Sequence, residues 1–172
     1  EGLETLDIKP NDTLLVHSSY KSLGTAELNP IEILKLIIGY LNKGTLILPA
    51  LSYEHVTPQN PCFDNRKTSS CVGHLPEVFR TNFNVIRSNH PTHSVCAIGK
   101  EASSLTYLHG EDDTPCGKNS PFSLLPNFNG KILMLGCGLK PNTFMHSVEE
   151  LIEPEYLFGE SINYSMIDHK GH

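Results

Sequence analysis

The sequence lacks the patterns that mark several other classes of protein. It contains no C-x-x-C pair, and its five cysteines are an odd number scattered along the chain, which argues against a disulfide framework and a zinc ribbon. No stretch approaches the roughly 18 apolar residues of a membrane span, and no signal peptide opens the chain. We therefore expect a cytoplasmic protein in which Cys96 and Cys137, both in apolar runs, are small buried side chains.

Basic residues are also scarce. The chain has 13 Lys and Arg against 19 Asp and Glu, which gives a net charge of −6. A nucleic-acid-binding protein needs a basic face to neutralise phosphates, so we expect neither a nucleic-acid nor a membrane partner. The acidic balance suits a cationic small molecule, although the same charge is also ordinary for a soluble protein.

The length of 172 residues is enough for one domain with a well-formed core. Its 38% hydrophobic and 19% charged residues are in the usual globular range, and the sequence has no internal repeat. We expect one domain over residues 1–172, as a monomer or a homodimer. The chain begins at Glu1 without Met and stops at His172 just after a strand-like run, so we expect both ends to be clipped.

Apolar runs alternate with helical patterns and predict an α/β fold. Short buried strands are expected at 13–17 and 45–49. Between them, Asn29-Pro30-Ile31-Glu32 combines a capping Asn, a Pro at the first helical position and a Glu at the third, so a helix begins there. This order predicts a right-handed crossover and a largely parallel central sheet with helices on both faces. Further strands are expected at 94–99 and, as the central strand, 131–137; further helices are expected at 73–81, 101–108 and 142–152.

One long segment, 52–71, is polar, contains Pro and shows no periodicity. A loop of this length inside a domain is usually functional, so a lid or a binding loop is expected here.

The first segment that suggests chemistry is His17–Gly24, which follows a buried strand. Ligands of open α/β sheets bind outside the carboxyl ends of strands, and a turn with backbone N–H groups, hydroxyls and a Lys suits a pyrophosphate. Serine-rich turns also occur without any ligand, and that alternative stays open.

The second segment is Arg87–Ser94, which leads into the strand at 94–99. Arg87 suits a bidentate contact with a phosphate, and an extended Pro-containing segment can expose backbone groups to the amides of a pantetheine chain. His90 and His93 are three residues apart, but Pro91 prevents a helix and no carboxylate or Cys lies at ligand spacing. We therefore expect no metal site.

The third segment is Leu135–Glu150. Its Gly-x-Gly follows a strand, but Pro141 stands where a dinucleotide fingerprint needs a third Gly, so a Rossmann cofactor is rejected. His146 and Glu149 are three apart and share one helix face. A carboxylate beside an imidazole fixes its tautomer and stabilises imidazolium, as a general base for an ammonium group requires. A solvated His and Glu pair without function is the alternative.

The three segments occur together and in this order, with further short motifs between them. The combination resembles the aminoglycoside 3-N-acetyltransferase family, also called the antibiotic N-acetyltransferases, over essentially the whole chain. The matching motifs are Val16-His17-Ser18-Ser19 with Ser22-Leu23-Gly24, Gly44 to Pro49, Phe63-Asp64 with Thr68-x-Ser70-x-Val72-Gly73, Arg87-Ser88-x-His90-Pro91-x-x-Ser94, Gly117-x-x-Ser120-Pro121, and Asn142-Thr143-x-x-His146-x-x-Glu149.

The resemblance implies an α/β fold unlike the GCN5-type acetyltransferases and direct transfer from acetyl-CoA to an amine. The expected acceptor is the 3-amino group of a 2-deoxystreptamine aminoglycoside, with antibiotic resistance as the consequence. The implied catalytic residues are His146, which we expect to act as the base, and its partner Glu149. Separately, we expect backbone N–H groups or a hydroxyl such as that of Thr143 to stabilise the oxyanion. The implied coenzyme-binding residues are Ser18, Ser19, Lys21, Ser22, Leu23, Gly24, Arg87, His90, Pro91, Thr92, Ser94 and Val95. Asp64 and Glu150 are the expected substrate contacts.

Two competing hypotheses remain. A thiol or serine hydrolase would use Cys96 or Ser19 with a histidine, but no Gly-x-Ser-x-Gly is present and an apolar strand disfavours a thiolate at Cys96. A family member that binds coenzyme A, yet is inactive on aminoglycosides or acts on another amine, would keep the same residues.

Overall fold

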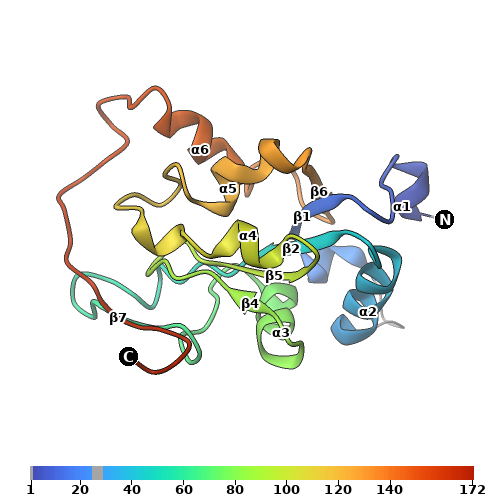
Figure 1. Ribbon diagram of the computed structural model, residues 1–172, viewed down its shortest axis with the longest axis horizontal. Coiled ribbons are helices and arrows are strands. Elements are labelled where there is room, and N and C mark those ends of the chain that lie inside the picture. Colours follow the sequence, from blue (N-terminus) through green and yellow to red (C-terminus); the bar gives the residue numbers. More distant parts are fainter. Residues whose placement is uncertain (1, 25–28) are drawn as a thin grey trace.

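The computed structural model of the protein describes residues 2–24 and 29–172 (Figure 1). The α-helices are α1 (Gly2–Thr5), α2 (Pro30–Tyr40), α3 (His74–Asn82), α4 (Ala102–Thr106), α5 (Pro121–Leu124) and α6 (Phe144–Glu150). The strands are β1 (Thr13–Ser18), β2 (Thr45–Pro49), β3 (Cys62–Asp64), β4 (Ile86–Arg87), β5 (Val95–Gly99), β6 (Lys131–Leu135) and β7 (Ser165–Ile167). None of the helices among these residues is long and apolar enough to cross a membrane.

The unit β1-α2-β2 forms as its local sequence predicts. The Asn29 side chain accepts a hydrogen bond from the backbone N–H of Glu32, and the Glu32 carboxylate accepts one from the N–H of Asn29, both at 3.0 Å. These two bonds satisfy backbone donors that the first turn leaves free, which fixes where α2 begins. β1 and β2 then pair in parallel, with Thr13 opposite Thr45.

The main sheet has the order β4-β5-β2-β1-β6. β2, β1 and β6 are parallel to one another, whereas β5 and β4 each pair antiparallel with their neighbours. The α/β class is confirmed, with the parallel part confined to three strands. β6 was expected at the centre of the sheet, but it stands at one end of this order and all five of its residues are only half-buried. An apolar run predicts a strand without predicting its neighbours.

The sheet separates two hydrophobic clusters, because successive side chains of a strand point to opposite faces. Leu14 and Val16 of β1 pack with residues of α2 and α3, whereas Leu15 packs with residues of α4 and α5. Figure 1 shows the same two layers of helices, one on each side of the sheet. Each of these three side chains is at most 1% exposed, and full burial of such a residue contributes about 1.5–3 kcal/mol.

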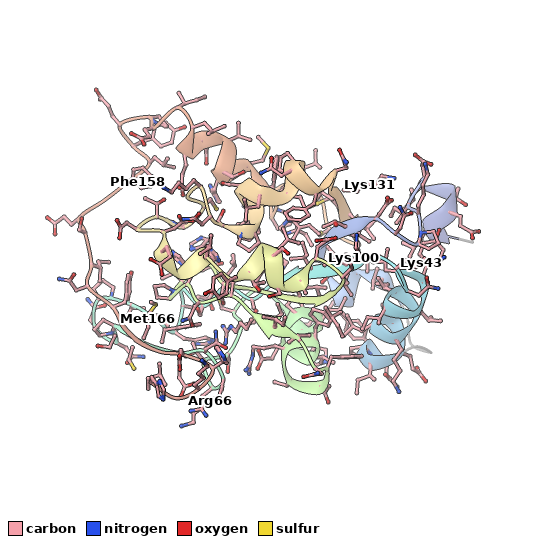
Figure 2. All side chains as sticks on the ribbon, in the orientation of Figure 1. Lys43, Arg66, Lys100, Lys131, Phe158 and Met166 are labelled. Carbon is pink, nitrogen blue, oxygen red and sulfur yellow. The ribbon has the colours of Figure 1, made fainter. Side chains whose placement is uncertain are left out.

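The segment 52–71 contains a strand that the sequence did not predict. β3 pairs in parallel with β7, about a hundred residues further along the chain. After α6 the chain runs around the outside of the molecule before it reaches β7 (Figure 1). Figure 2 shows Phe158 on this outer stretch and Met166 at its end, where they are 43% and 38% exposed. Pairing with so distant a partner leaves no local pattern in a three-residue strand.

Candidate active site

The first and third segments singled out in the sequence meet at the carboxyl ends of β1 and β6, and the second leads into β5, whose first residue, Val95, pairs with Pro49 at the carboxyl end of β2. These neighbouring strands run parallel, and the backbone N–H of Ser19 donates to the carbonyl of Leu135 at 2.9 Å. The chain leaves β1 toward α2 on one face and leaves β6 toward α6 on the other, where Phe144 packs against the cluster of α4 and α5. A crevice at such a reversal is where open α/β sheets bind ligands.

Gly136 allows the loops after β1 and β6 to touch. It has a φ of +69°, and a Cβ at this position would lie 2.8 Å from Leu23 Cδ2 and 2.9 Å from the carbonyl oxygen of Ser19. Only glycine fits without moving one of the loops. The loop after β1 is itself a tight 3-10 turn at Tyr20–Leu23, in which the hydroxyls of Ser19 and Ser22 are 2.8 Å apart. Lys21 and Ser22 are exposed on it, and Gly24 ends it with a φ of +63°.

Polar atoms without a partner are concentrated at this end of β1. Within residues 2–24 and 29–172, no hydrogen-bond partner is found for three buried atoms: His17 Nε2, Ser18 Oγ and Asn142 Oδ1. A buried polar atom left unpaired costs about 1–3 kcal/mol, so such atoms commonly mark a place that binds something. His17 is 5% exposed, and burial lowers its pKa to about 4, which keeps the imidazole neutral at pH 7.

A small cavity of about 50 Å³ lies at the same place. Its wall combines apolar side chains with the polar residues at the end of β1 and at the start of α6. The lining residues are Val16, His17, Ser18, Pro49, Val72, Pro76, Pro141 and Thr143. His17 begins the first segment predicted from the sequence, but it was given no individual catalytic or coenzyme-binding role; the available signal was a polar residue at the carboxyl end of an otherwise apolar strand.

The predicted pair on α6 is present. The Nδ1 atom of His146 lies 2.7 Å from Oε2 of Glu149, and the two side chains are 54% and 35% exposed. The imidazole is therefore reachable from solvent while one nitrogen is held by a carboxylate. Thr143 is 6% exposed, lines the cavity, and accepts a hydrogen bond at its carbonyl from the N–H of His146 at 3.0 Å. Thr143 thus connects the cavity to the turn of backbone that carries His146.

Three histidines form a cluster beside α6. The ring of His90 stacks on that of His109 with centroids 4.8 Å apart and meets His93 edge-on at 6.1 Å. The pKa of His93 is lowered to about 3 by burial, then by His90 and by His146. In the part of the chain that the structure describes, no group of three or more His, Cys, Asp or Glu is arranged to hold a metal ion.

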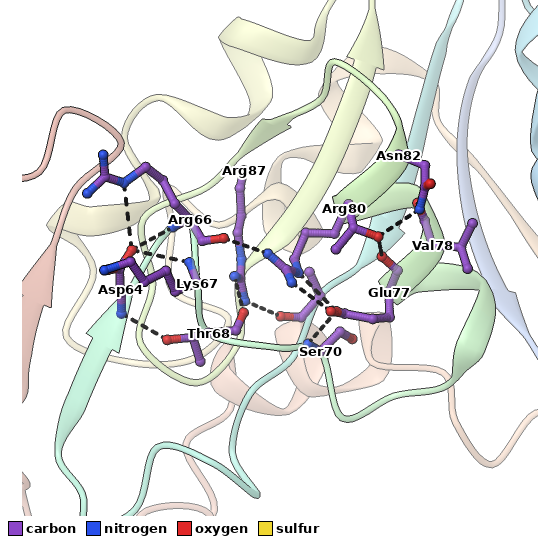
Figure 3. A network of polar contacts seen from close by, with 12 residues as sticks. Asp64, Arg66, Lys67, Thr68, Ser70, Glu77, Val78, Arg80, Asn82 and Arg87 are labelled. Atoms are coloured by element: carbon purple, nitrogen blue, oxygen red, sulfur yellow. Dashed lines mark hydrogen bonds and ion pairs between the residues drawn. The ribbon is translucent and has the colours of Figure 1, made fainter.

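Arg87 is a buried structural residue in this arrangement (Figure 3). Its Nε donates to Ser94 Oγ at 3.0 Å, and its terminal nitrogens donate to the backbone carbonyls of Ala50, Asn65 and Thr68. Burial lowers the pKa of Arg87 to about 10, so the guanidinium stays charged at neutral pH. These bonds connect the end of β2, the turn after β3 and the start of β5, and they use the donors that a phosphate contact would need.

The rest of the second segment is held against the start of the loop at 52–71. Ser52 donates from its hydroxyl to the carbonyl of Pro91 at 2.6 Å and from its N–H to the carbonyl of Thr92 at 2.8 Å. Ser94 Oγ donates to the carbonyl of Ala50 at 2.9 Å, and Val95 is fully buried at the start of β5. The path of residues 90–95 is therefore fixed by the protein itself.

Asp64 and Glu150, the expected substrate contacts, both bind neighbouring backbone. Asp64 Oδ1 accepts from the N–H groups of Arg66 and Lys67 at 2.9 and 3.2 Å (Figure 3). Glu150 Oε1 accepts from the N–H of Cys116 at 2.7 Å, and its Oε2 accepts from the hydroxyl of Thr114 at 2.6 Å. In this structure each carboxylate stabilises a turn.

Cys96 is fully buried, and burial raises its pKa to about 12. A thiol held neutral in this way is a poor nucleophile, which removes the basis for a hydrolase built on Cys96. Cys137, expected to be buried, is only half-buried because it follows the edge strand β6.

Comparison with known proteins gives consistent matches. The sequence pattern of the family described as aminoglycoside 3-N-acetyltransferase matches residues 15–172. The SPbeta prophage-derived aminoglycoside N(3')-acetyltransferase-like protein YokD of Bacillus subtilis (strain 168) is 27% identical over 170 residues, which cover 87% of this chain and 62% of YokD. The crystal structure of YokD superposes with a TM-score of 0.79 over 86% of this chain and 67% of that chain.

Two further relatives add detail. Aminoglycoside N(3)-acetyltransferase VII of Streptomyces paromomycinus is 28% identical over 171 residues, covering 88% of this chain and 58% of that protein. The solved structure described as AAC-IIIb binary with CoASH is 28% identical, with a TM-score of 0.76 over 87% of this chain and 62% of that chain. The chain thus spans about three fifths of the length of the curated relatives it matches.

Proposed function

Because the chain belongs to the aminoglycoside 3-N-acetyltransferase family, we propose that residues 1–172 act as an acetyl-CoA-dependent N-acetyltransferase domain. The proposed acceptor is an amine, specifically the 3-amino group of a 2-deoxystreptamine aminoglycoside. The observation that carries the proposal is the His146–Glu149 pair beside the cavity at the carboxyl end of β1. Relatives support the substrate classes, since one is named an aminoglycoside N(3)-acetyltransferase and another was solved with CoASH.

The coenzyme is proposed to lie in the crevice between the loops that follow β1 and β6. The buried unpaired atoms of His17 and Ser18 fit a ligand with polar groups there, and the exposed Lys21 offers a cation for a phosphate. Acetyl-CoA supplies the acetyl group as a thioester. Arg87 and Ser94 are proposed to act indirectly, by holding the path of residues 90–95 along the site.

His146 is proposed as the general base. With Nδ1–H held by Glu149, Nε2 is free to take a proton from the ammonium form of the acceptor. The amine nitrogen then forms a bond to the thioester carbonyl carbon and the carbon–sulfur bond breaks. The leaving thiolate takes the proton held by His146, and the second proton that the nitrogen loses as the amide forms passes to solvent. The hydroxyl of Thr143 is proposed to stabilise the charge that develops on the carbonyl oxygen.

A polycationic acceptor is proposed to approach from the α6 side. His146 is about half exposed there, and Glu153, Glu155 and Glu160 follow α6 on the surface. Their charges and the net charge of −6 favour the encounter with a polyamine. Asp64 and Glu150 are proposed to contact the acceptor only where it can displace or share their present backbone partners.

The test is release of free thiol from acetyl-CoA with gentamicin-type, kanamycin-type and simple amine acceptors. His146→Ala is expected to lose roughly 10²–10⁴ in turnover while its affinity for acetyl-CoA, measured by calorimetry, is retained. His55→Ala, at an exposed histidine far along the chain from α6, is the matched control and should behave as wild type. Near-normal turnover in His146→Ala would overturn the assignment of the base. Coenzyme binding without thiol release from any acceptor would instead favour an inactive coenzyme-binding member.

A further inference from the structure

We propose that the cavity at the carboxyl end of β1 receives the acyl group of the thioester donor and selects acetyl over longer chains. This inference rests on the proposed function, and it names the part of the donor that the cavity takes. The cavity is defined by its lining residues, with Val16, Pro49 and Val72 among the apolar ones and His17, Ser18 and Thr143 as the polar ones.

The chemistry of the wall matches an acetyl group. The valine and proline side chains offer apolar surface to a methyl group. His17 and Ser18 line the same cavity, and each carries a buried side-chain atom for which the described residues provide no partner. Both an imidazole N–H and a hydroxyl can donate to a carbonyl oxygen. A short acyl group would therefore offer its oxygen to one of these donors and its methyl to the apolar wall.

His17 is suited to donate without competing as a base. Burial keeps it neutral at pH 7, and one nitrogen of a neutral imidazole carries a proton. Because His17 and Ser18 are consecutive in β1, their side chains leave the strand on opposite faces. Both residues border the cavity at the end of the strand.

The cavity also lies close to His146, so an acyl group inside it would be near the proposed base. Thr143 is a wall residue, and its carbonyl accepts the hydrogen bond that begins the turn leading to His146. The imidazole thus stands one turn of backbone away from the wall, on the solvent side. An amine that loses its proton to His146 would meet the acyl group at the mouth of the cavity.

The volume sets the length limit. The cavity has a volume of only about 50 Å³. A methyl and a carbonyl fill such a space. Each further methylene must push into closely packed valine and proline side chains, and overpacking of that kind is unfavourable.

The first test widens the cavity. Dissociation constants of acetyl-, propionyl- and butyryl-CoA are measured by calorimetry on the whole chain, together with kcat/KM for transfer. The wild type is expected to prefer acetyl to butyryl by at least about tenfold, the scale of one methylene in a shaped pocket. Val72→Ala should reduce this preference by about tenfold. Val78→Ala, which removes the same atoms from α3 outside the cavity, should preserve it. Equal binding of acetyl- and butyryl-CoA in the wild type, or an unchanged ratio in Val72→Ala, would overturn the proposal.

The second test removes the polar donor. His17→Phe replaces the imidazole by a ring of similar size, so the folded protein loses an unpaired polar atom rather than a hydrogen bond. Its melting temperature is expected to equal or exceed that of the wild type, while the ratio of affinities for acetyl-CoA over CoA falls about tenfold or more. An unchanged ratio contradicts the role of His17. Binding ratios are measured without turnover, so failure of the proposed transfer reaction and failure of the acyl cavity give different results.

Discussion

His146 and Glu149 are joined by a 2.7 Å contact between Nδ1 and Oε2 on one face of α6, and both side chains are partly exposed. Burial does not fix the orientation of the ring, so the carboxylate must do so. The two side chains stay in contact only while residues three apart share one face. The helix α6, Phe144–Glu150, keeps them on that face.

Glu149→Gln is therefore expected to lower kcat more than it raises KM. Loss of a hydrogen bond to a charged group costs about 1.5–3 kcal/mol, which corresponds to about 10- to 100-fold in rate. Steady-state thiol release with a fixed aminoglycoside measures the effect. Glu153→Gln, an exposed carboxylate just beyond α6, is the control and should leave kcat unchanged. An equal loss in both variants would point to general charge rather than to orientation of His146.

Arg87→Ala is expected to destabilise the protein by about 3 kcal/mol or more. The change leaves the carbonyls of Asn65 and Thr68 without this donor, while the Ala50 carbonyl keeps only the Ser94 hydroxyl, and each unpaired buried group costs about 1–3 kcal/mol. Urea unfolding measures the free energy. Lys67→Ala removes an exposed cation of the same region and should change stability by less than about 0.5 kcal/mol. Unchanged stability with lost coenzyme affinity would instead assign Arg87 to a phosphate.

Acid is expected to destabilise the fold through His90 and His109. Burial, together with the neighbouring ring, lowers the pKa of His90 to about 3, and burial lowers that of His109 to about 4, from an ordinary value of 6.5. In the unfolded chain the two imidazoles therefore bind protons below about pH 6.5, whereas in the folded chain they stay neutral down to about pH 4. Stability is fully present above pH 6.5 and falls as the pH drops toward 4. Melting temperatures from pH 7.5 to 4.5 measure the fall. His109→Gln should flatten it and His55→Ala should not.

Alkylation is expected to distinguish the cysteines. Cys96 and Cys116 are at most 1% exposed, and burial raises the pKa of both thiols. Cys62 is exposed. Iodoacetamide should modify Cys62 in the native protein and reach Cys96 and Cys116 only after unfolding, as followed by mass spectrometry. Rapid modification of Cys96 in the native state would revive a thiol-based mechanism.

Local signals account for the parts of the fold that were predicted. The start of α2 depends on Asn29 and Glu32, which lie within one turn of each other, and the apolar runs of β1 and β2 each fit one short window. The position of β6 at the edge and the pairing of β3 with β7 depend on partners far along the chain. Periodicity in a short window carries no information about such partners.

The candidate site also has a part that local sequence predicts and a part that depends on distant segments. His146 and Glu149 were predictable because a spacing of three on a helix implies one face. The sequence led to a phosphate contact for Arg87 because its carbonyl acceptors lie in two distant segments, after β2 and after β3, and no side-chain motif records them. His17 was named only as the start of the first segment, because the burial of its Nε2 without a partner is a property of the folded chain alone.

The strand β1 contributes side chains to the hydrophobic core and ends at the candidate active site. Its side chains supply both hydrophobic clusters in strict alternation and end with His17 and Ser18. Deleting one residue within β1 would send Leu14 and Val16 toward α4 and α5 and would reverse the sides of the imidazole and the hydroxyl. A chain that places the leucines and the valine of β1 in the right hydrophobic clusters therefore also places the imidazole and the hydroxyl on the right faces of the sheet. Selection for a stable fold alone therefore keeps His17 and Ser18 on their present faces of the sheet.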